Sequence, residues 1–206
     1  MIRVVLDTFN QGGWIMWPIL MVSIVVWFTG LMKLYELWSL ERARRIFVSA
    51  FEKGIRISSE LVRTGDRHFD RLIKNLSGSN LSPVAFRMYF REFLLSIVPF
   101  TNQGLDSMAA FITVAPLLGL LGTVVGMIQT FDVITTFGVG NPALTAEGIS
   151  VALLTTEAGL IAAFPGLLLH NFINNRKTRF QKQLFIDGES IVKRFSGNGK
   201  QAGKHV

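Results

Sequence analysis

The sequence has no cysteine among its 206 residues. Disulfide frameworks, thiolate metal sites and cysteine nucleophiles are therefore excluded. Charge is also scarce, because only 17% of the residues are charged, against about 25% in a typical soluble domain. Half of the residues are hydrophobic, so the distribution of the few charges decides the class of protein.

Charged side chains are missing from two stretches of 25 residues, 8–32 and 107–131. A third stretch, 148–175, contains Glu157 as its single charged residue. A bilayer core of about 30 Å requires roughly 20 apolar helical residues, so each stretch is long enough to span a membrane. This pattern excludes a disordered chain and argues strongly against a soluble globular protein.

Aromatic residues mark both ends of the first apolar stretch. Trp14 and Trp17 lie near one end, and Tyr35 and Trp38 lie near the other, as in the aromatic belts of membrane helices. The apolar run is too long for a signal peptide, and no small-residue cleavage site follows it. We therefore predict an uncleaved transmembrane helix over residues 14–38.

The basic residues are segregated along the chain, which has a formal net charge of +7. All of the 21 Lys and Arg residues except Arg3 lie in residues 33–106 or after residue 175, whereas residues 132–147 contain two acids and no base. Positive segments remain cytoplasmic. The amino terminus and the 132–147 loop are therefore predicted outside, and a nucleic-acid-binding interpretation of the basic charge is disfavoured.

The predicted fold is an all-α integral membrane protein with three transmembrane helices and an outside amino terminus. The long helices extend into a cytoplasmic helical domain, and the protomers form an oligomer around a central pore. The predicted segments, in chain order, are a periplasmic amino terminus (1–13), transmembrane helix 1 (14–38), a cytoplasmic helical domain (39–106), transmembrane helix 2 (107–131), a periplasmic loop (132–147), transmembrane helix 3 (148–172) and a cytoplasmic basic tail (173–206).

Apolar residues after the first span recur at helical spacing, so this span is expected to continue into the cytoplasm as one amphipathic helix. A second cytoplasmic helix is expected to begin near Pro83 and to lead toward the second span. Its aromatic residues are expected to pack in a core, or alternatively to form a ligand site (Phe86, Tyr89, Phe90 and Phe93). The residues from Ser196 onward are expected to be disordered.

The second and third spans both carry stripes of small or weakly polar residues. In the second span, Gly122 and Gly126 form one pair four residues apart, and Gly119 and Thr123 form another. In the third span such residues recur at steps of three or four (Ala152, Thr156, Gly159, Ala163, Gly166 and His170). Small residues at this spacing let helix backbones approach closely in lipid. We expect these stripes to pack against other helices or to line a narrow pore. A helix-packing role is assigned to the small residues Gly119, Gly122, Gly126, Gly159, Ala163 and Gly166, and in an oligomer the stripes are expected to face the pore.

Thr123 and Thr156 are expected at the same depth, each about 6 Å from the midpoint of its span on the outer side. Hydroxyl groups at one depth would form a polar ring if the protein is an oligomer. The alternative is that each hydroxyl donates to a carbonyl of its own helix. Both interpretations remain open from the sequence.

Glu157 is the most costly residue of the chain to insert in a membrane. A charge near the bilayer centre costs about 2.5–3.5 kcal/mol on insertion scales, and protonation would avoid much of that cost. A carboxyl that exchanges protons suits a proton pathway, whereas the alternative is a structural carboxyl between helices. Because Glu157 is turned by about 100° from Thr156, it is expected to face the pore, the first span or a neighbouring subunit.

Asp132 and Glu147 lie at the outer ends of the second and third spans. They are candidates for acids that attract protons to the entrance of a pathway, and the alternative is ordinary solvated loop acids. The sequence contains no metal-ligand cluster and no nucleotide-binding or hydrolase motif. We therefore predict neither a cofactor nor an enzymatic activity.

Residues 115–127 (APLLGLLGTVVGM) resemble the second-span motif of the MotA/TolQ/ExbB proton-channel family. Residues 148–166 (GISVALLTTEAGLIAAFPG) resemble the third-span motif of that family, and residues 12–20 resemble the start of its first span. The three-span layout and the mid-sized cytoplasmic segment look more like ExbB or TolQ than like the larger four-span MotA.

The resemblance implies a bacterial inner-membrane energiser driven by the proton-motive force. Members form homo-oligomers, generally pentamers, around an ExbD- or TolR-type single-span partner that supplies a proton-binding aspartate. The work reaches the outer membrane through a TonB- or TolA-type transducer, for transport or for membrane integrity. By motif position, Thr123 and Thr156 correspond to the polar pore ring of the family.

One position departs from the family pattern. Many ExbB and TolQ proteins have a glutamate where this sequence has Val151, and here the acid comes six residues later, at Glu157. Six residues turn a helix by about 600°, so the acid lies on a different face. A rival hypothesis is a non-conducting membrane scaffold, which would keep the small-residue packing but would not need Glu157.

Overall fold

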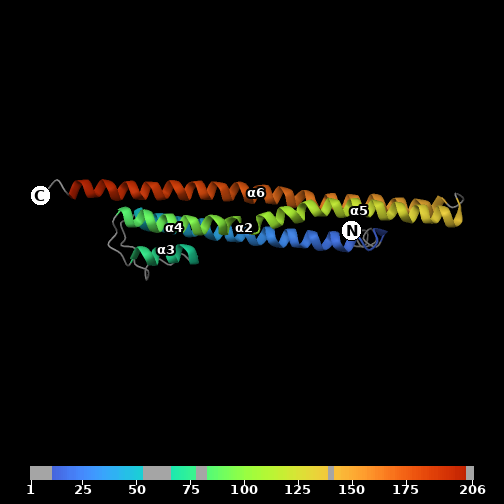
Figure 1. Cartoon of the computed structure of the whole chain (residues 1–206), viewed down its shortest axis with the longest axis horizontal. Helices are drawn as coiled ribbons and strands as arrows, with labels where there is room; N and C mark the ends of the chain where they lie inside the picture. Colours follow the sequence, from blue (N-terminus) through green and yellow to red (C-terminus); the bar gives the residue numbers. More distant parts are fainter. Residues whose placement is uncertain (1–10, 53–65, 78–82, 139–141, 203–206) are drawn as a thin grey trace. The chain divides into compact units, whose positions relative to one another are not determined.

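The computed structural model describes residues 11–52, 66–77, 83–138 and 142–202. These residues form five helices (Figure 1): α2 (Met16–Glu52), α3 (Arg67–Ser77), α4 (Pro83–Asn102), α5 (Leu105–Phe137) and α6 (Pro142–Ala202). Within these ranges the chain forms no β-strand. Three helical segments are long and apolar enough to cross a membrane, so the all-α prediction with three long apolar helices is confirmed.

The chain divides into two compact units. The first unit contains Met1–Met32 and Gly104–Phe172, and the second contains Lys33–Gln103 and Ile173–Val206. The first unit holds the three charge-poor stretches of the sequence apart from residues 173–175, and the second holds most of the basic residues. The sequence pattern differs between the two units. The first unit is built mainly from continuous apolar runs, whereas in the second unit apolar residues recur at helical spacing among charged ones.

Proline and glycine set several helix boundaries. Pro83 and Pro142 occupy the first positions of α4 and α6, where the missing N–H is not needed for a helical hydrogen bond. Gly104 separates α4 from α5 with φ of 85°, a left-handed conformation that other residues adopt only at a cost. These residues explain why one helix ends at Asn102 and the next begins at Leu105.

In the first unit, α5 and α6 lie side by side and antiparallel (Figure 1). Gly119 of α5 lies against Gly159 of α6, while Gly126 lies against Gly148. The segment of α2 in this unit also contacts α6, because a Cβ on Gly166 would lie 2.7 Å from Val26 Cγ1. Small residues thus allow three apolar helices to pack with short interaxial distances.

In the second unit, aromatic side chains fill a hydrophobic core. Phe69 of α3 lies with its ring centroid 4.9 Å from that of Phe93 of α4, and Phe86 stacks on Phe90 at 5.6 Å. These four side chains are buried in one cluster with apolar residues of α2 and α6. The expected core packing is therefore confirmed for the phenylalanines of α4, while Tyr89 lies partly buried at the edge of the cluster.

The two helices that the sequence predicts outside the apolar spans are present, with one correction to the end of the chain. Helix α2 continues to Glu52, and α4 begins at Pro83 as expected. The expectation of disorder from Ser196 onward is wrong for residues 196–202, because α6 continues to Ala202; residues 203–206 lie outside the described residues. No proline follows Pro165, and an established helix tolerates single glycines at about 1 kcal/mol each.

Candidate functional site

The closest approach in the first unit is a seam between α5 and α6, formed by Gly119, Gly159 and their neighbours. A Cβ on Gly119 would lie 2.9 Å from the carbonyl oxygen of Thr155, and one on Gly159 would lie 2.8 Å from that of Ala115. Both contacts are with backbone atoms, so any larger side chain would force the helices apart. Within the protomer these glycines lie against the opposite helix, as expected of residues assigned to helix packing.

Two further glycines extend the seam toward the end of α5 and the start of α6. A Cβ on Gly122 would lie 2.1 Å from the hydroxyl oxygen of Thr155, and one on Gly126 would lie 2.6 Å from the carbonyl oxygen of Gly148. Thr155 is completely buried here, and its hydroxyl donates to the carbonyls of Val151 and Ala152. The sequence analysis did not single out Thr155, although its spacing of three and four residues from Ala152 and Gly159 places it on the same face.

Thr123 and Thr156 lie beside this seam and not within it. Each follows a seam residue directly, since Gly122 contacts Thr155, and both are partly exposed. In an antiparallel pair, a step of one residue forward on each helix moves to the same side of the contact. The two hydroxyls therefore share one side of the seam at similar depth.

The hydroxyls of Thr123 and Thr156 both bond to backbone carbonyls of their own helices, which was the alternative to a polar ring. The Thr123 hydroxyl donates to the carbonyl of Leu120 at 2.7 Å. The Thr156 hydroxyl lies 3.2 Å from the carbonyl oxygen of Ala152 and 3.3 Å from that of Gly119 on α5. Bonding within the helix does not exclude a polar lining, because each oxygen keeps lone pairs that can accept a further hydrogen bond.

Glu157 lies on the surface of the first unit. Its side chain is exposed, and its neighbours on the same face, Leu153 and Leu160, are 68% and 56% exposed. Within the part of the chain that the structure describes, its carboxylate has no hydrogen bond or ion pair. The first-span alternative is therefore wrong, because α2 leaves this face of α6 uncovered.

The two candidate entrance acids are exposed, whereas Val151, which replaces a glutamate common in the family, is partly buried. Asp132, near the end of α5, and Glu147, near the start of α6, are both exposed. Val151 is partly buried, one turn before Thr155, and its carbonyl accepts the Thr155 hydroxyl. His170 is partly buried on α6.

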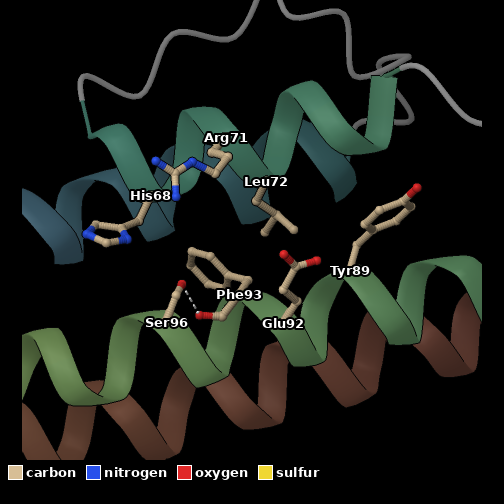
Figure 2. A pocket seen from close by; sticks show the side chains of 7 residues that line it. All are labelled: His68, Arg71, Leu72, Tyr89, Glu92, Phe93 and Ser96. Carbon is tan, nitrogen blue, oxygen red and sulfur yellow. Dashed lines mark hydrogen bonds between the residues drawn. The ribbon is translucent and has the colours of Figure 1, made fainter.

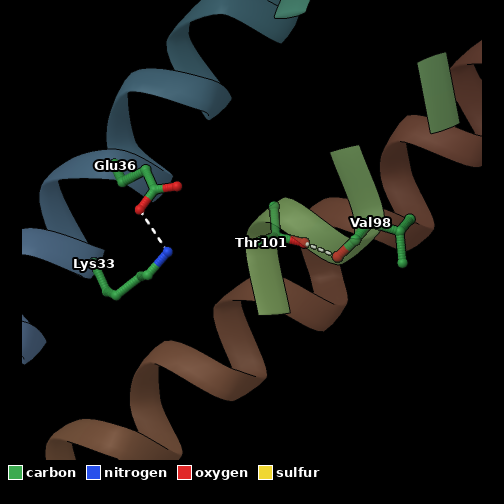
Figure 3. A network of polar contacts seen from close by, with 4 residues as sticks. All are labelled: Lys33, Glu36, Val98 and Thr101. Atoms are coloured by element: carbon green, nitrogen blue, oxygen red, sulfur yellow. Dashed lines mark hydrogen bonds and ion pairs between the residues drawn. The ribbon is translucent and has the colours of Figure 1, made fainter. Parts of the chain in front are cut away.

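The second unit contains a buried ion pair that the sequence analysis missed (Figure 3). Lys33 is only 8% exposed, and its Nζ donates to Glu36 Oε2 at 2.7 Å. The same ammonium lies 5.4 Å from the centre of the Phe100 ring, an arrangement that gains cation–π attraction. Nearby in Figure 3, the Thr101 hydroxyl donates to the carbonyl of Val98. In the sequence, this ion pair is indicated only by the spacing of three residues between Lys33 and Glu36.

A bidentate ion pair joins α2 and α6 in the same unit. Arg176 donates from Nε to Glu41 Oε1 at 2.8 Å and from Nη2 to Oε2 at 2.7 Å. The hydrogen bond from the guanidinium lowers the pKa of Glu41 below its ordinary value, although burial acts in the opposite direction. The same bond raises the pKa of Arg176. A second ion pair between these helices joins Arg44 and Asp187.

A small cavity lies between α3 and α4 in the second unit (Figure 2). Its volume is about 50 Å³, and its lining includes His68, Arg71, Tyr89 and Glu92. Ligand pockets for small molecules usually have volumes of about 300–1,000 Å³, so this cavity is large enough for water alone. Among the described residues, no three His, Asp or Glu side chains come together as metal ligands.

Comparison with known proteins places these features in a family. The sequence model of the MotA/TolQ/ExbB proton channel family matches residues 56–185. The chain belongs to this family. The matched segment contains all of α5 and most of α6, and therefore the seam, both threonines and Glu157.

Curated relatives agree with this assignment. An ExbB homolog of Methanothermobacter thermautotrophicus is 33% identical over 184 residues, which are 84% of this chain and 63% of that protein. An ExbB-like protein of Synechocystis is 31% identical over 175 residues, covering 80% of this chain and 68% of the relative. The biopolymer transport protein ExbB of Aquifex aeolicus is 39% identical over 77 residues, which cover 37% of this chain and 49% of that protein. The chain thus spans about two thirds of the length of the first two relatives.

Family membership and the three apolar helices together identify a multi-pass membrane protein of ExbB type. The family is one of proton channels that energise transport and is not an enzyme class. In this context the α5–α6 seam combines close backbone packing with two flanking hydroxyl groups in an apolar helix pair.

Proposed function

We propose that this chain is an ExbB-type energiser subunit of a bacterial inner membrane, driven by the proton-motive force. It conducts protons with an ExbD- or TolR-type single-span partner, and it powers a TonB- or TolA-type transducer for outer-membrane transport or integrity. The proposed assembly is a homo-oligomer, expected to be a pentamer, with the amino terminus outside and the second unit in the cytoplasm.

The observation that supports this proposal most directly is the position of Thr123 and Thr156. Both hydroxyls lie on one side of the α5–α6 seam, partly exposed, in the segment matched by the proton channel family. A ring of such pairs would line the channel with oxygen atoms at one depth, which is how narrow pores replace part of the hydration of an ion. The glycines of the seam let α5 and α6 approach closely, which keeps the two hydroxyls near each other.

Three acidic residues complete the proposed pathway. Glu157 is the single charged residue of the third apolar stretch, and we assign it the exchange of protons within the membrane. Asp132 and Glu147, exposed at the outer ends of α5 and α6, raise the local proton concentration at the entrance. The proposed work is mechanical and electrostatic, with no covalent chemistry and no cofactor.

The experiment is proton flux into vesicles that contain this chain and its single-span partner. Thr156→Ala and Glu157→Gln are each expected to reduce the partner-dependent flux at least tenfold. Thr29→Ala is the matched control, because the Thr29 hydroxyl also donates to carbonyls of its own helix but lies on α2, away from the seam. The control is expected to retain the flux of the wild-type protein.

The rival scaffold hypothesis is one of the outcomes of the same experiment. A scaffold would assemble with its partners and conduct nothing, so the wild-type protein would show no partner-dependent flux. If flux is present but neither Thr156→Ala nor Glu157→Gln changes it, the energiser function stands and the assignment of these residues is wrong.

A further inference from the structure

Two buried threonines of the first unit have no part in the proposed pathway. Thr130 lies on α5 and Thr155 on α6, and both side chains are buried. Resting on the proposed function, we propose that Thr130 and Thr155 are positioning residues. Each fills the space beside a glycine of the opposite helix, and together they fix α5 against α6 so that the Thr123 and Thr156 hydroxyls stay at one level.

The two threonines make reciprocal contacts across the seam. A Cβ on Gly122 of α5 would lie 2.1 Å from Thr155 Oγ1 and 2.4 Å from Thr155 Cβ. In the other direction, a Cβ on Gly148 of α6 would lie 2.3 Å from Thr130 Oγ1. Each threonine side chain therefore occupies the volume that a side chain on the facing glycine would need.

The hydroxyl groups of both threonines are satisfied within their own helices. Thr130 donates to the carbonyl of Gly126 at 2.9 Å, and Thr155 donates to the carbonyls of Val151 and Ala152 at 2.9 and 3.0 Å. Burial of these hydroxyls thus avoids the cost of an unpaired polar group. Because a branched Cβ restricts χ1, each side chain is a rigid body that acts across the seam through its shape.

Two such contacts restrict the helix pair more than one contact does. Gly148 and Thr155 are seven residues apart on α6, and Gly122 and Thr130 are eight apart on α5, which places the two contacts about 10–12 Å apart along the helices. A single contact leaves the helices free to pivot about it. Two contacts at this separation, with one threonine from each helix, set both the rotation of α6 and its register along α5.

The position of the Thr156 hydroxyl depends on that rotation. Successive residues of a helix are about 100° apart, so any rotation of α6 that moves Thr155 away from Gly122 also moves Thr156. The Thr156 hydroxyl lies 3.3 Å from the Gly119 carbonyl oxygen, which is already long for a hydrogen bond between oxygen atoms. A small rotation or shift of α6 is therefore enough to break this contact across the seam.

Proton flux with the single-span partner separates the shape of the two side chains from their hydroxyl groups. Thr155→Ala and Thr130→Ala remove both, and each is expected to reduce the flux about fivefold, the factor that corresponds to one ordinary hydrogen bond. Thr155→Val and Thr130→Val keep the branched shape and are expected to retain the flux. Thr29→Ala is the matched control, because Thr29 also donates to the carbonyls three and four residues before it, and it is expected to conduct as the wild-type protein does.

A double-mutant cycle distinguishes positioning of Thr156 from general destabilisation. Thr155→Ala is compared in the wild-type and Thr156→Ala backgrounds, by flux and by the free energy of unfolding in mixed micelles. If Thr155 acts through Thr156, both effects are expected to be smaller in the Thr156→Ala background, because neighbouring residues that share an interaction are not additive. Equal effects in the two backgrounds would overturn the proposal. Valine variants that lose as much flux as the alanine variants would also overturn it, because the hydroxyl groups and not the shape would then be required.

The unfolding cycle keeps this inference separate from the proposed function. If the wild-type protein conducts no protons, the energiser function is refuted, and the unfolding cycle alone decides whether Thr155 positions Thr156. If flux is present and both Thr155→Ala and Thr130→Ala conduct as the wild-type protein does, the positioning role is refuted and the energiser function stands.

Discussion

Replacing Gly119 with alanine tests how closely α5 and α6 approach each other. The added Cβ would lie 2.9 Å from the Thr155 carbonyl oxygen and 3.1 Å from the Thr156 Cα, whereas optimal contacts are about 3.5 Å or longer. No side-chain rotation can relieve contacts with backbone atoms, so the helices must separate by about half an ångström. Overpacking of this kind costs about 1–3 kcal/mol.

Gly30→Ala is the matched control for this substitution. Its Cβ would also meet close neighbours, but these are the ends of flexible side chains, Leu169 Cδ2 at 2.5 Å and Met108 Cε at 3.1 Å. Both substitutions gain the same helix propensity, about 1 kcal/mol, so this gain cancels in the comparison. We expect the free energy of unfolding of Gly119→Ala to be about 1–2 kcal/mol below that of Gly30→Ala.

The assay is reversible unfolding in mixed micelles with increasing dodecyl sulfate, followed by the fluorescence of the 4 tryptophans. A second readout is proton flux with the single-span partner, because separating the helices removes the 3.3 Å contact of the Thr156 hydroxyl with the Gly119 carbonyl. Equal free energies of unfolding for the two variants would refute the close backbone approach at the seam.

Three further predictions concern the second unit. Because the hydrogen bond from Arg176 lowers the pKa of Glu41, the ion pair contributes fully above the unfolded-state pKa of Glu41 and loses its contribution as the pH falls through the lower folded-state pKa. The stability difference between the wild-type protein and Arg176→Met is thus expected to be about 1 kcal/mol at neutral pH and to shrink in denaturant titrations as the pH falls below the ordinary pKa of a glutamate; a difference that stays constant with pH would contradict it. Lys33→Met leaves the Glu36 carboxylate without its cation and is expected to lower the free energy of unfolding by about 1–3 kcal/mol. The double variant Lys33→Met/Glu36→Gln should recover part of this loss in the same titration, and no recovery would argue against the ion pair. Phe69→Ala empties a fully buried position and is expected to cost about 3–5 kcal/mol, visible as a lower thermal midpoint; an unchanged midpoint would contradict the aromatic core.

The sequence predicted the features that depend on local composition and periodicity. The three apolar helices followed from stretches without charge, because the length required to span a bilayer is a property of a single segment. The continuation of α2 to Glu52 and the start of α4 at Pro83 followed from helical spacing and from the preference of proline for the first turn. The aromatic core followed from the burial preference of phenylalanine.

The features that the sequence did not predict depend on which helix covers which face. Periodicity placed Gly119, Gly122 and Gly159 on common faces, but it does not distinguish a face that lines a pore from one that meets another helix, since both require small residues. The burial of Thr155 and the exposure of Glu157 depend on the position of α2 and α5 around α6. The Lys33–Glu36 pair was missed because a spacing of three residues between opposite charges is common on exposed helices as well.

Partner-dependent proton flux is the measurement that tests the proposed function most directly. Vesicles containing the wild-type chain with its single-span partner are exposed to a pH gradient, and vesicles with either protein alone are the controls. We predict that protons enter only when both proteins are present, and that Thr156→Ala reduces this flux while Thr29→Ala does not. Equal flux with and without the partner, or none in any of the vesicles, would contradict the energiser function.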